Sequence, residues 1–126
     1  MNRIEKAVEL KHNNHNCCQA VLVSFADELD ISAENLKRLG AGFAAGMGGM
    51  EGTCGALCGA EMILGLKEYQ GKPLMKKSKE IHQAFKEKSG ATICKELKGI
   101  DTGKVLCSCD DCVRHGVQVI EELQQV

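Results

Sequence analysis

Eight cysteines in 126 residues are the side chains of this sequence most able to do chemistry. A free cysteine can simply fill a buried position, but that explanation suits one or two of them rather than the whole set. In a reducing compartment, so many thiols favour metal, cluster or redox chemistry over structural disulfides. We therefore expect a site in which thiolates bind a metal or exchange electrons.

The cysteines fall in four separate stretches of the chain. Several lie where a helix is expected to begin, and the free N–H groups and positive dipole end of a helix start favour thiolate. The paired CxxC pattern of zinc modules, the ferredoxin cysteine run and the CxxCH haem motif do not occur. The placement indicates a site assembled between helices from Cys17 and Cys18, Cys54 and Cys58, Cys94, and Cys107, Cys109 and Cys112.

Two local relationships refine this list. Cys54 and Cys58 are four residues apart, so we expect both on one face of a helix. His15 and His115 lie close to cysteines in the sequence and could supply a ligand or a proton, although an exposed polar role is more common.

The apolar residues recur with helical spacing almost throughout. Asn16 and Ser32 are suited to cap the second and third helices. No stretch alternates apolar and polar residues well enough to predict a strand. The sequence thus predicts an all-α fold, a compact bundle of five or six helices in one domain over residues 1–126. The helical stretches are about 2–13, about 17–29, from Ser32 to Phe43, about 53–69, from Pro73 to Gly90, ATICKEL, and from Asp110 or Asp111 onward.

A glycine-rich segment precedes the fourth expected helix. GMGGMEG, residues 46–52, is expected to form a tight loop because glycine accepts backbone angles that other residues avoid. Within the helix, Gly55 and Gly59 form a small-xxx-small pair that predicts the close approach of another helix. GAGFAA, residues 40–45, loosely matches a dinucleotide-binding pattern, but a helical segment precedes it where a strand is required.

Charge and composition limit the expected partners and compartment. Sixteen basic residues nearly balance seventeen acidic ones, so nucleic-acid binding is not expected. The first residues lack the apolar core of a signal peptide, and the weakly charged stretch 39–66 is too rich in glycine to span a membrane. We therefore expect a cytoplasmic protein with no membrane partner. The apolar faces of so small a bundle suggest a homodimer, and the sequence identifies no electron-transfer partner.

The cysteine stretches together resemble the C-GCAxxG-C-C family of redox-active proteins over nearly the whole chain. NCCQAV, residues 16–21, looks like the family's amino-terminal cysteine segment. CGALCG, residues 54–59, is similar to its CGAxxG motif, and ICKEL, residues 93–97, to its third cysteine segment. The fourth family cysteine is expected just before the final helix.

This resemblance implies a cofactor and a set of ligands. A related helical region occurs in split-Soret cytochromes, which carry an iron–sulfur centre besides their haems, and the likeness implies an iron–sulfur cluster here. The cluster would serve electron transfer or redox sensing. The implied ligands are Cys17, Cys54, Cys94 and Cys109, with Cys107 and Cys112 as rivals for the last place. The thiols beyond the basic pattern, Cys18, Cys58, Cys107 and Cys112, could be additional ligands, a second centre or a resolving pair.

Three other interpretations fit the same residues. Adjacent thiols could cycle between dithiol and disulfide without any metal. Zinc could instead stabilise a helical binding module, which would unfold on chelation. The cysteines could also be incidental core residues. A hydrolase is not expected, because the chain has no Ser/His/Asp signature.

Overall fold

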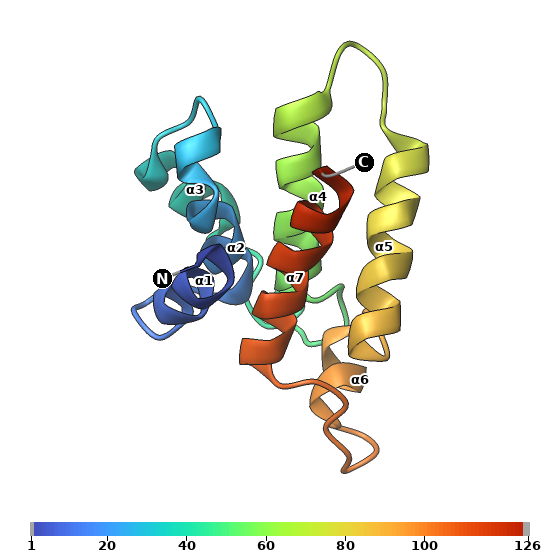
Figure 1. The fold of residues 1–126 in the computed structure, drawn as a ribbon. Helices are drawn as coiled ribbons and strands as arrows, with labels where there is room; N and C mark the ends of the chain where they lie inside the picture. Colours follow the sequence, from blue (N-terminus) through green and yellow to red (C-terminus); the bar gives the residue numbers. More distant parts are fainter. Residues whose placement is uncertain (1, 125–126) are drawn as a thin grey trace.

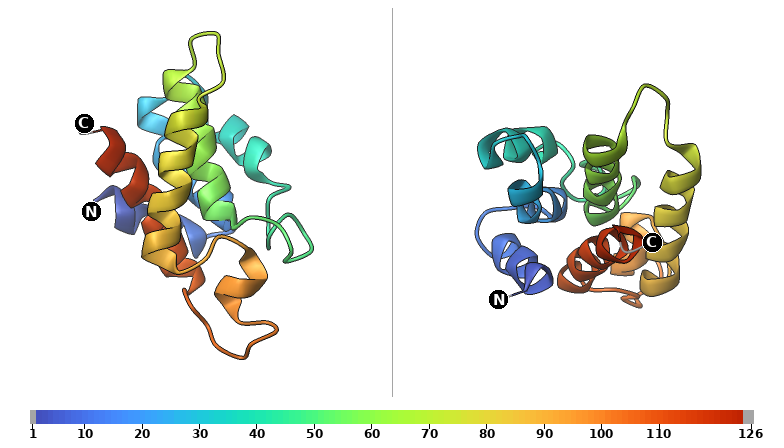
Figure 2. Two further views of the ribbon diagram at one scale, coloured as in Figure 1. Left: turned by 90° about the vertical axis from the view of Figure 1, so that its right-hand side faces the viewer. Right: turned by 45° about the horizontal axis from the view of Figure 1, so that its top comes forward.

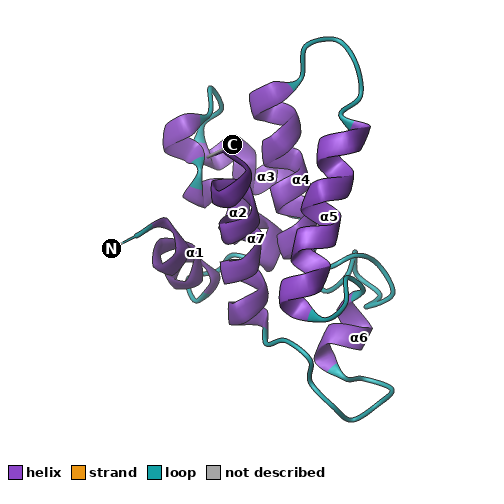
Figure 3. Cartoon of the chain, turned by 45° about the vertical axis from the view of Figure 1, so that its right-hand side comes forward, coloured by secondary structure: helices purple, strands orange, loops and turns teal. Residues whose placement is uncertain are grey.

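The computed structural model describes residues 2–124, in which helices are joined by loops (Figures 1 and 3). Within these residues no strand forms, and the one extended contact is an isolated bridge between Thr53 and Ile93. The all-α class is confirmed, with seven α-helices in the described chain where five or six were predicted. The elements are α1 (Arg3–Lys11), α2 (Cys17–Ser24), the 3-10 helix η1 (Ala26–Glu28), α3 (Ala33–Gly40), α4 (Gly55–Glu68), α5 (Met75–Ser89), α6 (Cys94–Lys98) and α7 (Cys109–Gln124).

The helices surround one apolar core. α7 contacts α1, α2, α4 and α5, and the right-hand view of Figure 2 shows it between α1 and α5. The short helix α6 lies at the lower end of the molecule in Figure 1, where α4 and α7 also begin. This end of the bundle therefore collects several helix starts. The largest fully buried side chains include Leu22, Phe25, Leu57, Ile63, Phe85 and Val117.

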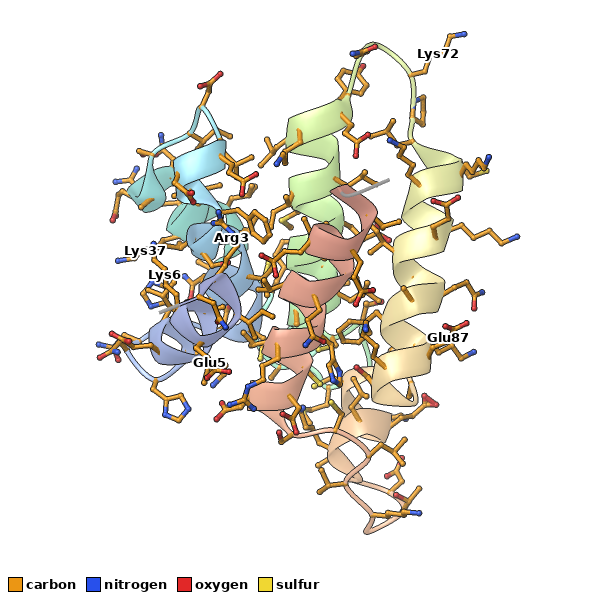
Figure 4. All side chains as sticks on the ribbon, viewed as in Figure 1. Arg3, Glu5, Lys6, Lys37, Lys72 and Glu87 are labelled. Carbon is orange, nitrogen blue, oxygen red and sulfur yellow. The ribbon has the colours of Figure 1, made fainter. Side chains whose placement is uncertain are left out.

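Charged side chains cover the outside of the bundle. Lys72 in the α4–α5 loop and Glu87 on α5 point away from it (Figure 4). Arg3 lies over the ring of Phe25, 4.5 Å from its centroid, and also pairs with Asp27. Among the helices of residues 2–124, none combines the length and the apolar character needed to cross a bilayer.

Both predicted caps form. The Asn16 side chain accepts the backbone N–H of Gln19, and the Gln19 side chain accepts the N–H of Asn16, which makes a capping box at the start of α2. Ser32 caps α3 by accepting the N–H of Asn35. The cap at Asn16 holds the first residue of α2, a cysteine, in a defined position.

Several predicted helix boundaries are wrong, among them those of the second, third and fifth helices. The second helix stops at Ser24, whose hydroxyl donates to the carbonyl of Val21, and the chain continues as η1. The third ends at Gly40, three residues before Phe43, which lines the cavity described below. The fifth begins at Met75 and not at Pro73, because the intervening leucine packs on the core in a non-helical conformation.

The predicted close approach at Gly55 and Gly59 is confirmed. A Cβ atom on Gly55 would lie 2.9 Å from the carbonyl oxygen of Phe43, and one on Gly59 would lie 3.0 Å from the carbonyl oxygen of Cys18. These distances leave no room for a methyl group. The two glycines thus let α4 approach α2 closely, beside the start of each helix.

We expect Gly59→Ala to destabilise the protein by about 1–3 kcal/mol, because the added methyl group overpacks this contact. Gly65→Ala is the matched control in the same helix, since nothing lies within 4 Å of the added Cβ atom. That variant should gain up to about 1 kcal/mol from helix propensity. Urea unfolding of both variants measures the difference. Equal effects at the two positions would contradict the close packing.

Candidate functional site

Four cysteines from distant segments line one partly open cavity of about 310 Å³. They are Cys17, Cys54, Cys94 and Cys109, the four positions that the sequence resemblance implies as ligands. The structure therefore brings this whole set to one place. The rest of the lining consists of Lys11, Asn16, Phe43, Ala44, Ala45, Gly46, Met50, Gly55 and Lys98.

Each of the four thiols stands at the beginning of a helix. Cysteines are the first residues of α2, α6 and α7, and Cys54 is the N-cap of α4. Helix starts present unpaired N–H groups and the positive end of the dipole, so they stabilise thiolate. The fold thus directs four helix starts at one cavity.

Backbone hydrogen bonds hold two of these thiols side by side. The N–H of Cys54 donates to the carbonyl of Thr92 at 2.8 Å, and the N–H of Cys94 donates to the carbonyl of Gly52 at 3.0 Å. The isolated bridge described above lies between these two hydrogen bonds. The glycine-rich loop is therefore joined to the α5–α6 connection, which positions the starts of α4 and α6 together.

The loop between α3 and α4 is strained where it meets the cavity. Ala45, Met47 and Met50 have φ angles of 50°, 62° and 64°, which cost of order 1–3 kcal/mol each for residues other than glycine. Gly46 has a φ of 61°, and a Cβ atom on it would lie 2.6 Å from the Cβ of Cys94. The Met50 sulfur lies 3.7 Å from the Cys94 sulfur. Such strain persists where a functional geometry requires it.

Lys98 brings a positive charge to the thiols. Its Nζ donates to the Cys112 sulfur at 3.5 Å and to the carbonyl of Cys107 at 3.0 Å. A hydrogen bond from the Cys17 thiol, together with the Lys98 ammonium, lowers the pKa of Cys109 to about 5 against the opposing effect of burial. The same contact raises the pKa of Cys17. One thiol of this pair thus ionises readily while its neighbour keeps its proton.

A second thiol contact joins α7 to the start of α4. The neighbouring Cys112 thiol lowers the pKa of Cys54 to about 7, and the same contact raises the pKa of Cys112. Burial raises the pKa of Cys94. Cys54 and Cys109 are therefore the lining cysteines that most readily supply a thiolate near neutral pH.

The other four cysteines do not line this cavity. Cys18 is buried with its sulfur 4.0 Å from the sulfur of Met62, and Cys107 and Cys112 are also buried. Cys58 lines a neighbouring pocket of about 330 Å³. Cys54 and Cys58, which were predicted to share a helix face, line different pockets: Cys54 is the N-cap of α4 in a non-helical conformation, and Cys58 lies inside the helix.

Neither histidine singled out in the sequence lines the cavity. The Nδ1 atom of His15 lies 2.7 Å from the carbonyl of Asn13, and His115 contacts Ser89. Sequence reasoning missed Lys98 as a site residue, although it follows Cys94 by four residues on α6 and so falls on the same helix face. In residues 2–124, no group of three or more Cys, His, Asp or Glu side chains has an arrangement that could hold a metal ion.

Comparison with known proteins places these residues in a family. Residues 15–123, which include all eight cysteines, match the family model described as "Putative redox-active protein (C_GCAxxG_C_C)". An uncharacterized protein of Archaeoglobus fulgidus is 30% identical over 107 residues, which cover 73% of this chain and 71% of the relative. No solved structure matches the chain. The family match spans well over half of the chain, and the protein therefore belongs to the C_GCAxxG_C_C family of redox-active proteins.

Proposed function

We propose that this protein holds an iron–sulfur cluster between Cys17, Cys54, Cys94 and Cys109 and uses it for electron transfer or redox sensing. The observation that carries the proposal is that these four thiols, each at a helix start, line a single cavity. Four cysteine thiolates are the usual ligand set of [2Fe–2S] and [4Fe–4S] clusters.

The shape and chemistry of the cavity support a cluster. A volume of about 310 Å³ is far larger than one metal ion. A cluster contains several iron atoms, so its ligands need not converge on one point as the ligands of a single ion must. When bound, it would supply one-electron redox chemistry.

The chain's own residues would bind the cluster and compensate its charge. Cys54 and Cys109 have lowered pKa values and need little help to ionise, whereas Cys17 and Cys94 would release protons as iron binds. Lys98 would offset part of the negative charge of four thiolates. Apolar lining residues, Phe43 among them, would limit the access of water.

The test is the metal content of the full-length protein purified without oxygen. We expect iron and acid-labile sulfide in comparable amounts, visible absorbance, and an electron paramagnetic resonance signal in one oxidation state. Colourless, iron-free protein after anaerobic reconstitution would overturn the proposal. Redox-silent zinc would favour the zinc-stabilised module instead.

A further inference from the structure

We propose that Cys107 and Cys112 form a second redox centre, a thiol pair that hydrogen peroxide oxidises to a disulfide with His115 as the base. Neither cysteine lines the cavity assigned to the cluster. The pair goes beyond the proposed function, because it performs two-electron thiol chemistry with residues outside the proposed ligand set.

The start of α7 brings the two side chains together. Ser108 immediately precedes the helix; its hydroxyl accepts the N–H of Asp111 at 3.1 Å and its carbonyl accepts the N–H of Cys112 at 2.9 Å. Ser108 is thus the N-cap, which makes Cys107 the N′ residue and Cys112 the N4 residue. Side chains at these two positions characteristically pack against each other. The Cys112 thiol accordingly donates to the carbonyl of Cys107, with the sulfur 3.9 Å from the oxygen.

An imidazole is held against one member of the pair. The Nδ1 atom of His115 lies 3.7 Å from the Cys107 sulfur and 2.7 Å from the hydroxyl oxygen of Ser89. The His115 ring also packs edge-on against Phe85, with the centroids 6.4 Å apart. Ser89 and Cys107 face the same ring nitrogen, so Ser89 fixes the ring where Nδ1 reaches the Cys107 thiol, and its hydroxyl oxygen can accept the Nδ1 proton once the ring is protonated. A cysteine beside a base in this way is an activated nucleophile.

Burial assigns different roles to the two thiols. Cys107 is 5% exposed and Cys112 is fully enclosed, so an oxidant from solvent reaches only Cys107. The narrow access favours a small oxidant such as hydrogen peroxide. Cys107 is also fixed by its backbone, since its N–H donates to the carbonyl of Leu97 and its carbonyl accepts from Lys98. Cys107 is therefore the thiol attacked first, and Cys112 is the resolving thiol.

The reaction balances without a further reactant. Cys107 gives its proton to His115, and its sulfur attacks one peroxide oxygen as the O–O bond breaks. The hydroxide released takes the proton from His115 and leaves as water, and Cys107 becomes a sulfenic acid. The Cys112 sulfur then attacks the sulfenic sulfur, and the S–S bond forms as the S–O bond breaks. The hydroxyl group and the Cys112 proton leave as a second water, so two thiols lose two electrons and one peroxide gains them.

The decisive experiment locates the disulfide in the full-length protein. Anaerobically purified protein receives one equivalent of hydrogen peroxide, free thiols are alkylated, and the chain is cut with trypsin and with a protease that cleaves before aspartate. Cleavage before Asp110 separates Cys107 and Cys109 from Cys112, and fragmentation at Ser108 distinguishes the first two. We expect a Cys107–Cys112 bond and a mass loss of two hydrogens. A bond that joins other cysteines instead would overturn the proposal.

Variants test the assigned roles. In Cys112→Ser, a dimedone reagent should trap a sulfenic acid at Cys107. In His115→Gln, oxidation should slow on the order of a hundredfold, while His82→Gln, a change at another half-buried histidine, should leave the rate unchanged. An unchanged rate in His115→Gln would remove the histidine from the proposal.

The iron content of variants distinguishes a failure of the thiol-pair proposal from a failure of the cluster proposal. Cys107→Ser and Cys112→Ser should keep the wild-type iron content, and loss of iron from either variant would show a ligand and overturn the thiol pair. A Cys107–Cys112 bond in an iron-free wild-type protein would support the pair while it overturns only the cluster.

Discussion

Cys54→Ser is expected to abolish binding of the proposed iron–sulfur cluster, while Cys58→Ser leaves it intact. Cys54 lines the cavity and has a lowered pKa, so its loss removes a ligand that ionises near neutral pH. Even outer-shell changes reduce metal affinity by about 10–100-fold, and loss of a ligand should exceed that. Iron, sulfide and visible absorbance of anaerobically purified variants measure the effect.

Cys54→Ser and Cys58→Ser make the same chemical change, and neither is expected to disturb the folding of α4. Serine is a favourable N-cap residue, so Cys54→Ser should not weaken α4, and the loss of the ligand is isolated from a loss of helix. Cys58 belongs to the same sequence motif but lines the neighbouring pocket. Urea unfolding in the presence of chelator should show similar stability for the two metal-free proteins. Iron retained in Cys54→Ser, or lost equally from both, would remove Cys54 from the ligand set.

Lys98→Met is expected to lower the reduction potential of the proposed cluster by on the order of 100 mV. Reduction adds a negative charge, which the Lys98 ammonium in the cavity wall stabilises. A unit charge about 8 Å from another at an effective dielectric constant near 20 contributes about 2 kcal/mol. For one electron, about 59 mV corresponds to a tenfold change in the equilibrium constant. A redox titration followed by paramagnetic resonance measures the shift.

Lys95→Met provides the control for this charge effect. Lys95 lies on the same helix and its replacement removes the same charge, but it pairs with Asp101 at 3.6 Å and does not line the cavity. The reduction potential of Lys95→Met should stay near that of the wild type. The reduction potential of Lys98→Arg should also stay near it, because the charge is kept. Equal shifts in Lys98→Met and Lys95→Met would mean that Lys98 has no specific role.

The helical class, the caps and the close packing of α4 could all be predicted from the sequence. Asn16 and Ser32 cap the helices that they precede, and Gly59 meets the backbone of α2. Caps and helical periodicity depend on residues within a few positions of one another, so the local sequence carries them. The small-xxx-small pair is likewise visible as a spacing, although its partner helix is not.

The sequence resemblance identified part of the cysteine site, and the structure was needed for the rest. The family resemblance implied Cys17, Cys54, Cys94 and Cys109, and the structure brings all four to one cavity. The sequence could not separate Cys54 from Cys58, because the four-residue spacing does not show that Cys54 is the N-cap of α4 and that the two thiols line different pockets.

The surroundings of the thiols were decided by the tertiary structure alone. The structure shows that Lys98 contacts Cys112. It also shows that His115 contacts Cys107 and Ser89. No local pattern encodes such contacts, because they depend on how α5, α6 and α7 pack together. The sequence by itself therefore determined that this is a helical, cysteine-rich redox protein. Tertiary packing decided which thiols share a cavity and which lie beside an ammonium or an imidazole.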